Sequence, residues 1–181
     1  MKSSYYQSTV AYTSFGGSLL IIEAISMNGT GRLTMTGSLQ KTIKESILAA
    51  YDYIKANSEK YGIEKTYFSS HNIHLQAVEI SIPKEGPSAG ITSATVLLSV
   101  ITNKLIRSDV AMTGELTVQG EVLPVGGIKD KINAAYRAGI KTVILPNKNK
   151  EDIIYLNPEI KESLKFVFVE NIDEVLEEAL I

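Results

Sequence analysis

The chain has 181 residues, of which 44% are hydrophobic and 21% charged, and its formal net charge at pH 7 is −2. This size and composition are typical of one globular domain, and no basic cluster is long enough to follow a phosphate backbone, which argues against nucleic-acid binding. The absence of cysteine excludes disulfides, cysteine-based zinc sites and a thiol nucleophile. No apolar run could span a bilayer, and the polar start does not resemble a signal peptide, so we expect a cytoplasmic chain without membrane contact.

The hydrophobic periodicity predicts strands followed by an alternation of helices and strands. In chain order, it indicates strands over 10–14, 19–25 and 32–36, a helix over 39–60, a strand over 73–82, a helix over 89–102, a strand over 109–113, a helix over 129–138, a strand over 141–145, a short helix near 152, a strand over 166–169 and a helix over 173–180. Ser38 is available as the cap of the first helix. This order indicates an α/β or α+β fold. We expect a polar tail over 1–8 and one compact domain over 9–181.

Residues 86–90 read Gly-Pro-Ser-Ala-Gly, which matches the G-x-S-x-G pattern of a nucleophilic serine. In α/β-hydrolases the histidine follows the serine, whereas His71 and His74 both precede Ser88, so that architecture is excluded. Two interpretations of Ser88 remain. It is either the N-cap of helix 89–102, or a nucleophile beside helix-start amides that could bind an oxyanion.

A nucleophilic serine needs a base, and without a downstream histidine a lysine is the remaining common choice. Lys131 flanks the apolar face of helix 129–138, next to Ile132, whereas Lys129 points about 200° away around the helix. Burial and the helix start both lower the pKa of an amine, which must fall from about 10.4 to about 7 for a base at neutral pH. The alternative is a surface lysine that extends its amine into solvent.

The stretches PKEGPSAG (83–90) and DVAMTGELTVQGEVLPVGGIKDKINAAYRAGIKTVILP (109–146) closely resemble the proteolytic domain of Lon, the ATP-dependent protease of the A type. The resemblance covers about residues 9–180. It implies that Ser88 is the catalytic serine, that Lys131 is the catalytic lysine and that Thr113 hydrogen-bonds this lysine. It also implies that Glu115 organises the site or a subunit contact. A substrate and oxyanion loop would comprise Glu85, Gly86, Pro87 and Ala89.

The resemblance further implies a serine endopeptidase that cleaves unfolded proteins through an acyl-enzyme. In this family, ATP and Mg²⁺ bind to an N-terminal ATPase domain that this chain lacks, and six chains form a ring. No cofactor or metal ion is expected in this domain, and the sequence contains no P-loop motif. The implied fold is the compact Lon-protease-domain fold, with mixed sheets packed against helices, and it is related to the ribosomal-protein and GHMP-kinase-like superfamily.

Three alternatives stay open at this point. PKEGPSAGITSAT loosely resembles the phosphate loop of GHMP kinases, so a phosphate could bind to the same helix amides. A catalytically silent Lon-like assembly module is also compatible with the sequence. The extended stretch 75–82, in which residues 77–81 depart from the family pattern, is either an edge that pairs with substrate or a core strand.

Overall fold

The computed structural model describes residues 5–13, 16–78, 81 and 83–181. In this part of the chain, seven strands form one sheet in the order β3-β4-β2-β1-β5-β8-β9. The strands are β1 (Tyr5–Thr13), β2 (Gly16–Asn28), β3 (Leu33–Thr36), β4 (His71–Ala77), β5 (Val110–Met112), β8 (Thr142–Pro146) and β9 (Lys165–Val169). A separate two-stranded hairpin consists of β6 (Glu115–Leu116) and β7 (Val122–Leu123).

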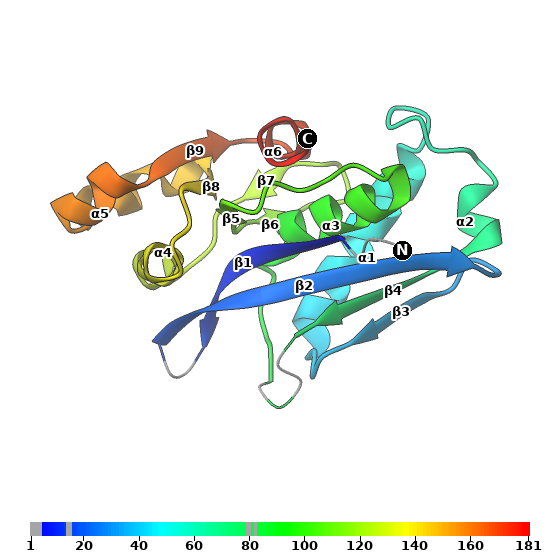
Figure 1. Cartoon of the computed structure of the whole chain (residues 1–181), viewed down its shortest axis with the longest axis horizontal. Helices are drawn as coiled ribbons and strands as arrows, with labels where there is room; N and C mark the ends of the chain where they lie inside the picture. Colours follow the sequence, from blue (N-terminus) through cyan, green and yellow to red (C-terminus); the bar gives the residue numbers. More distant parts are fainter. Residues whose placement is uncertain (1–4, 14–15, 79–80, 82) are drawn as a thin grey trace.

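The helices connect these strands and cover the sheet (Figure 1). They are α1 (Lys41–Ala56), α2 (Tyr67–Ser70), α3 (Gly90–Thr102), α4 (Ile128–Arg137), the 3₁₀-helix η1 (Asn147–Tyr155), α5 (Pro158–Ser163) and α6 (Ile172–Ala179). Strands β1, β2 and β4 pair antiparallel, whereas β1, β5, β8 and β9 pair parallel. The expected α/β class with a mixed sheet is therefore confirmed, while the relation to the ribosomal-protein and GHMP-kinase-like superfamily stays a prediction.

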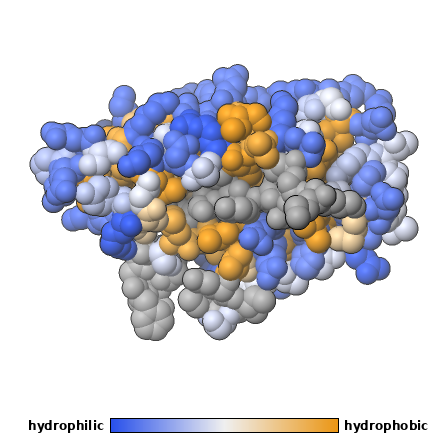
Figure 2. Space-filling view, in the orientation of Figure 1, coloured by the Kyte–Doolittle hydropathy of each residue, from blue (hydrophilic) through white to orange (hydrophobic). Residues whose placement is uncertain are grey.

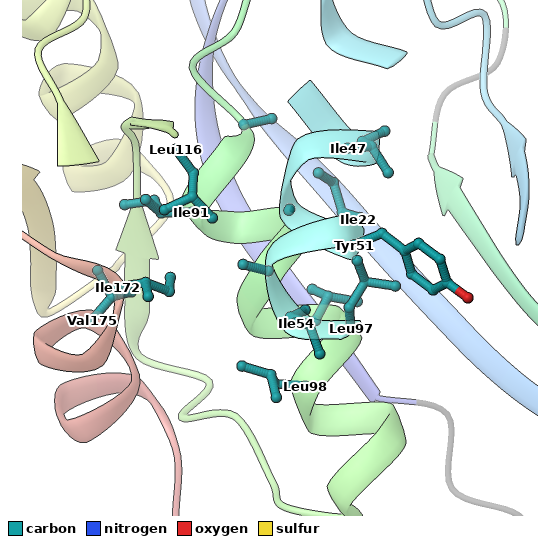
Figure 3. Close-up of a cluster of buried hydrophobic side chains, with 14 of the residues drawn as sticks. Ile22, Ile47, Tyr51, Ile54, Ile91, Leu97, Leu98, Leu116, Ile172 and Val175 are labelled. Carbon is teal, nitrogen blue, oxygen red and sulfur yellow. The ribbon is translucent and has the colours of Figure 1, made fainter. Parts of the chain in front are cut away.

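Alternate side chains of the central strands separate the buried residues into two clusters. Met112 of β5 and Ile144 of β8 belong to the first cluster, which α1, α3 and α6 complete. Ala111 and Val143, their neighbours along the same strands, belong to the second cluster, which α4 completes. Successive strand residues point to opposite faces of a sheet, so the two clusters lie on opposite faces. Figure 3 shows part of the first cluster, including Ile54 of α1 and Leu97 of α3.

Helix α1 has the predicted apolar stripe, but its start differs from the prediction. Ile43, Ile47 and Ile54 are all buried, as their spacing predicted. The helix begins at Lys41 with Gln40 as its N-cap, so the prediction of Ser38 as the cap was wrong. The physical reason is a long-range pairing, in which the Lys84 amide donates to the Ser38 carbonyl at 3.1 Å and Ser38 has a φ of 56°. This pairing fixes the backbone of Ser38 outside the helix, so α1 begins only at Lys41.

Two further expectations at the sheet need correction. Residues 5–8, expected in a tail over 1–8, belong to β1 and pair with β2. Strand β4 pairs with β2 on one side and with β3 on the other, so Leu75 and Gln76 have no free edge for a substrate and the core-strand interpretation holds there. Residues 79, 80 and 82 of the same stretch lie outside the described residues.

The face drawn in Figure 2 is mainly hydrophilic, with separate hydrophobic patches. Val118, Ile154 and Tyr155 are among the exposed large apolar side chains of the described residues. None of the helices in the described part of the chain combines the length and apolar content that crossing a membrane requires.

Candidate active site

A pocket of about 570 Å³ lies between two glycine-containing loops. The first loop, residues 85–88, leads into α3, and the second, residues 124–127, leads into α4. Ser88 and Lys131 both line this pocket, although many residues separate them in the chain. The fold therefore brings together the two residues that the sequence singled out as nucleophile and base.

Ser88 does not cap α3, so the N-cap interpretation of Ser88 was wrong. The helix begins at Gly90 and its N-cap is Ala89. A bridge to the end of β5 causes this shift, because the Gly114 amide donates to the Ser88 carbonyl at 2.9 Å and the Ile91 amide donates to the Gly114 carbonyl at 3.2 Å. The backbone of Ser88 is used for this pairing, and its half-buried side chain lies at the pocket.

The two glycines of the G-x-S-x-G motif are needed for different reasons. Gly86 has a φ of +100°, a conformation that residues with a side chain rarely adopt. At Gly90 the limit is space, since an added Cβ would lie 2.6 Å from the Leu116 backbone nitrogen and 3.0 Å from Ser46 Oγ. The motif therefore allows a turn before Ser88 and a close approach of α3 to α1 and β6 after it.

Lys131 lies on the buried side of α4, as the periodicity predicted. Its side chain is only 2% exposed, so the alternative of a solvent-reaching lysine was wrong, whereas Lys129 is exposed. Burial lowers the pKa of Lys131 from 10.5 to about 8. The pKa is thus lowered by less than the fall to about 7 that we expected from the sequence. A pKa of about 8 still leaves an appreciable fraction of the amine neutral near pH 7.

Thr113 joins the two candidate catalytic residues. Lys131 Nζ donates a hydrogen bond to Thr113 Oγ1 at 3.1 Å, and Thr113 Oγ1 donates to the Ser88 carbonyl at 3.2 Å. The hydrogen bond between threonine and lysine that the family resemblance implied is therefore present. A threonine hydroxyl has one proton, and because that proton goes to Ser88, Thr113 can only accept from Lys131. A neutral Lys131 amine thus keeps its lone pair for another proton donor.

Ser46 of α1 fixes the peptide group between Pro87 and Ser88. The Pro87 carbonyl oxygen accepts from Ser46 Oγ at 3.2 Å and from the Gly90 amide at 3.1 Å. In a planar trans peptide group the C=O and N–H bonds point in opposite directions. The Ser88 amide therefore points away from the buried Ser46 side chain.

The next peptide group is fixed in the same way from β5. The Ser88 carbonyl oxygen accepts from Thr113 Oγ1 and the Gly114 amide, so the Ala89 amide points away from both residues. Within the described part of the chain, the Ser88 and Ala89 amides have no hydrogen-bond partner. Two adjacent amides of fixed direction are suited to stabilise an oxyanion.

The amides expected from the helix start are not available for this role. The Gly90 amide donates to the Pro87 carbonyl, and the Ile91 amide donates to the Gly114 carbonyl. We expected the oxyanion donors among the amides around Ser88 at the helix start, and the Gly90 and Ile91 amides cannot serve because both are already hydrogen-bonded. The donors that remain belong to Ser88 itself and to Ala89.

The other predicted site residues have more peripheral positions. Glu85 is exposed at the pocket, where its carboxylate accepts from the Gly86 amide at 3.1 Å, and a hydrogen bond from the Thr42 side chain lowers its pKa. The side chain of Ala89 is buried, so only its backbone can act at the pocket. Glu115 lies in β6 and does not line the pocket, and its role stays a prediction.

Two residues near the site were not identified from the sequence. Ser46 lies three residues after Ile43 within the buried face of α1, and a polar residue on an apolar stripe is a signal that could have been used. Asn149 is 6% exposed and contacts the second loop of the pocket. It lies in the polar stretch Asn147–Lys150, which gives no local indication of burial.

Comparison with known proteins identifies relatives over nearly the whole chain. Residues 5–181 match the family described as the Lon protease (S16) C-terminal proteolytic domain. The Lon protease of Desulforamulus reducens is 49% identical over 95% of this chain and 21% of its own length. Lon protease 1 of Myxococcus xanthus is 48% identical over 95% of this chain and 21% of its own length. The Lon protease of Aquifex aeolicus is 49% identical over 95% of this chain and 22% of its own length. The chain therefore spans about a fifth of the length of these curated relatives.

Proposed function

The chain belongs to the family of Lon protease (S16) C-terminal proteolytic domains, which are serine peptidases, and from that premise we propose that it hydrolyses peptide bonds through Ser88 and Lys131. One observation carries the assignment of the two residues. Lys131 is 2% exposed, its amine has a pKa of about 8, and the residue shares a pocket with Ser88. This is the combination that a lysine base and a serine nucleophile require.

The proposed reaction is an acyl transfer in two steps. The lone pair of Lys131 takes the Ser88 hydroxyl proton while Ser88 Oγ attacks the peptide carbonyl carbon. The Ser88 and Ala89 amides stabilise the oxyanion, and the Lys131 ammonium group then protonates the leaving nitrogen as the C–N bond breaks. In the second step Lys131 takes a proton from water, whose oxygen attacks the acyl carbon, and the Lys131 ammonium group then protonates Ser88 Oγ as the ester bond breaks. Thr113 holds the amine in place throughout.

We also propose that the chain is the proteolytic part of a longer ATP-dependent protease. The support is that the related Lon proteases are about five times as long as the matched region. In this proposal an ATPase domain elsewhere in the protein binds ATP and Mg²⁺, unfolds protein substrates in the cytoplasm and assembles into a hexameric ring. This chain alone is expected to cleave unfolded peptides without ATP. Degradation of a stably folded protein by this chain on addition of ATP would contradict the proposal that a separate ATPase domain unfolds the substrates.

The catalytic assignment can be tested with a quenched fluorescent peptide. We expect Ser88→Ala and Lys131→Ala each to reduce kcat/KM by about 10³-fold or more, because each removes a group that takes part in bond formation. Lys129→Ala is the matched control, one exposed lysine on the same helix, and should keep most of the rate. Wild-type kcat/KM should decrease about tenfold for each pH unit below 8, as the base becomes protonated. Full activity of Lys131→Ala would disprove the assignment.

The two other functions considered from the sequence make different predictions. A silent assembly module would not react with a peptide boronate at Ser88, whereas the proposal requires binding that Ser88→Ala abolishes. A phosphate-binding kinase would bind ATP, and the family assignment to serine peptidases gives no support for it. Calorimetry with ATP distinguishes this last case.

A further inference from the structure

The 3₁₀-helix η1 has an unusual burial pattern. Asn149 is its one buried residue, at 6% exposure, although the element also contains isoleucines and a tyrosine. A polar side chain in a buried position costs free energy unless its hydrogen bonds are satisfied. The position of Asn149 therefore depends on specific partners rather than on hydrophobic burial.

The partners of Asn149 are the backbone of one residue and one carboxylate. The Val125 amide donates to Asn149 Oδ1 at 3.0 Å, and Asn149 Nδ2 donates to the Val125 carbonyl at 3.0 Å. Asn149 Nδ2 also donates to Asp152 Oδ2 at 2.7 Å. The side-chain amide of Asn149 thus pairs with Val125 as a peptide group of a neighbouring strand would, and both of its N–H bonds are used.

Val125 belongs to the wall of the active-site pocket. Residues 124–127 all line the pocket that contains Ser88 and Lys131, and Gly127 is the N-cap of α4. Both backbone groups of Val125 point towards Asn149. Because trans peptide groups are planar, the Pro124 carbonyl and the Gly126 amide must point away from Asn149. Asn149 therefore sets the direction of a backbone acceptor and a backbone donor on the wall.

From this arrangement we infer that Asn149 is a positioning residue for substrate binding, which orients the Pro124 carbonyl and the Gly126 amide to pair with the backbone of an extended peptide in the pocket. The inference rests on the proposed peptidase function. Recognition through the backbone is independent of side-chain identity, which suits a site that accepts many peptide sequences. Asn149 contacts neither Ser88 nor Lys131, so its loss should weaken peptide binding and leave the reactivity of Ser88 intact.

The test compares peptide hydrolysis with direct modification of Ser88. In Asn149→Asp, a carboxylate oxygen replaces Nδ2 and faces the Val125 carbonyl. We expect KM for an unfolded peptide to rise about tenfold with kcat changed less than threefold. The rate at which phenylmethylsulfonyl fluoride labels Ser88, and the pH dependence of that rate, should equal those of the wild type. This small reagent needs the nucleophile and its base but no peptide backbone pairing.

Two controls distinguish loss of the hydrogen bond between residue 149 and the Val125 backbone from repulsion between two carboxylates. Asn147→Asp places a carboxylate beside Glu170, which Asn147 Nδ2 contacts at 2.7 Å, so it creates the same kind of repulsion on η1 without touching Val125. The double change Asn149→Asp with Asp152→Asn removes the repulsion between 149 and 152 but not the loss of the donor to Val125. The inference expects Asn147→Asp to keep the wild-type KM and the double variant to keep the raised KM.

Asn149→Ala is the second variant, and it decides the result if thermal unfolding shows that Asn149→Asp is not folded at the assay temperature. A folded Asn149 variant with wild-type KM would overturn the inference. So would a decrease in kcat and in labelling rate at unchanged KM, because that pattern indicates a defect in the Ser88–Lys131 pair. If the wild type neither labels nor cleaves, the proposed function itself fails, which is a distinct result.

Discussion

Ser88 and Lys131 are held by two differently built parts of the molecule. On the Ser88 side, hydrogen bonds from α1 and from the end of β5 fix the backbone, while the side chain is half-buried. On the Lys131 side, burial dominates, and among the described residues the amine has one hydrogen bond, to Thr113. The proposed nucleophile thus depends on oriented peptide groups, and the proposed base depends on exclusion of water. Substitutions on the two sides should therefore have different kinetic signatures.

The largest effect is expected from Lys131→Met, which keeps the apolar volume and removes the amine. Peptide cleavage should fall by about 10³-fold or more, because no base remains. Stability at pH 7 should increase by on the order of 3 kcal/mol at most, the free energy that corresponds to a pKa of about 8 instead of 10.5. Urea unfolding and peptide kinetics on the same samples measure both quantities.

The pH dependence of this stability gain has a definite sign. The amine binds a proton more weakly in the folded chain than in the unfolded chain, so the wild type is destabilised fully below pH 8. The destabilisation disappears as the pH rises through 10.5, and the difference between Lys131→Met and wild type should vanish there. Lys129→Met is the exposed control and should show neither effect. A less stable Lys131→Met at pH 7 would contradict the role of burial.

Thr113→Val changes the residue that links the two sides. It removes the acceptor for Lys131 Nζ and the donor to the Ser88 carbonyl at nearly constant volume. We expect kcat/KM to fall about 30-fold, in line with the loss of two buried hydrogen bonds. The apparent pKa of the pH–rate profile should also decrease, because an acceptor stabilises the charged amine more than the neutral one.

Thr113→Ser keeps the hydroxyl and is the conservative control, which should restore most of the rate and the wild-type pH profile. If Thr113→Val had the same rate as the wild type, the hydrogen-bonded link would have no function. An unchanged pH profile with a reduced rate would indicate that Thr113 acts only through Ser88.

The smallest effect is expected from Ser46→Ala, which removes one of the two donors to the Pro87 carbonyl. The Ser88 amide then has a less defined direction, and we expect kcat to fall about 5–10-fold, less than for deletion of an oxyanion donor itself. KM and the pH–rate profile should not change, since Lys131 is untouched. A lower kcat at unchanged KM and pH–rate profile is the result expected when only the orientation of the Ser88 amide changes.

Ser99→Ala is the matched control, because it removes another buried hydroxyl, one that lies near the C-terminal end of α3 and donates to the Lys104 carbonyl beyond the helix. It should keep the wild-type kcat. Equal losses in Ser46→Ala and Ser99→Ala would mean that general loosening of the helices, and not the orientation of the Ser88 amide, causes the effect.

Features that depend on local spacing were predicted from the sequence. The position of Lys131 beside the apolar face of α4 follows from helical periodicity in a ten-residue helix, and the apolar stripe of α1 follows from the same rule. The proposed catalytic pair was indicated jointly by the motif at Ser88 and by the family resemblance. The hydrogen bond between Thr113 and Lys131 came from the resemblance alone, because no local pattern relates a strand end to a later helix.

Features that depend on contacts between distant segments were missed. The N-cap prediction at Ser38 failed because Lys84 pairs with that segment, and the cap prediction at Ser88 failed because Gly114 pairs with its carbonyl. The burial of Asn149 follows from its pairing with Val125, which the polar sequence around it conceals. In each case a backbone group is hydrogen-bonded to a residue far away in the chain. Local sequence propensities do not contain information on such long-range contacts.

The most direct test is an NMR titration of the Lys131 side chain in the wild-type protein, with the ¹³Cε resonance assigned by its absence in Lys131→Arg. We predict a pKa of about 8 for this amine, lowered from 10.5 by burial. A Lys131 resonance that titrates at 10.5 or above would show that the amine is fully charged at neutral pH. It could not then act as the base for Ser88.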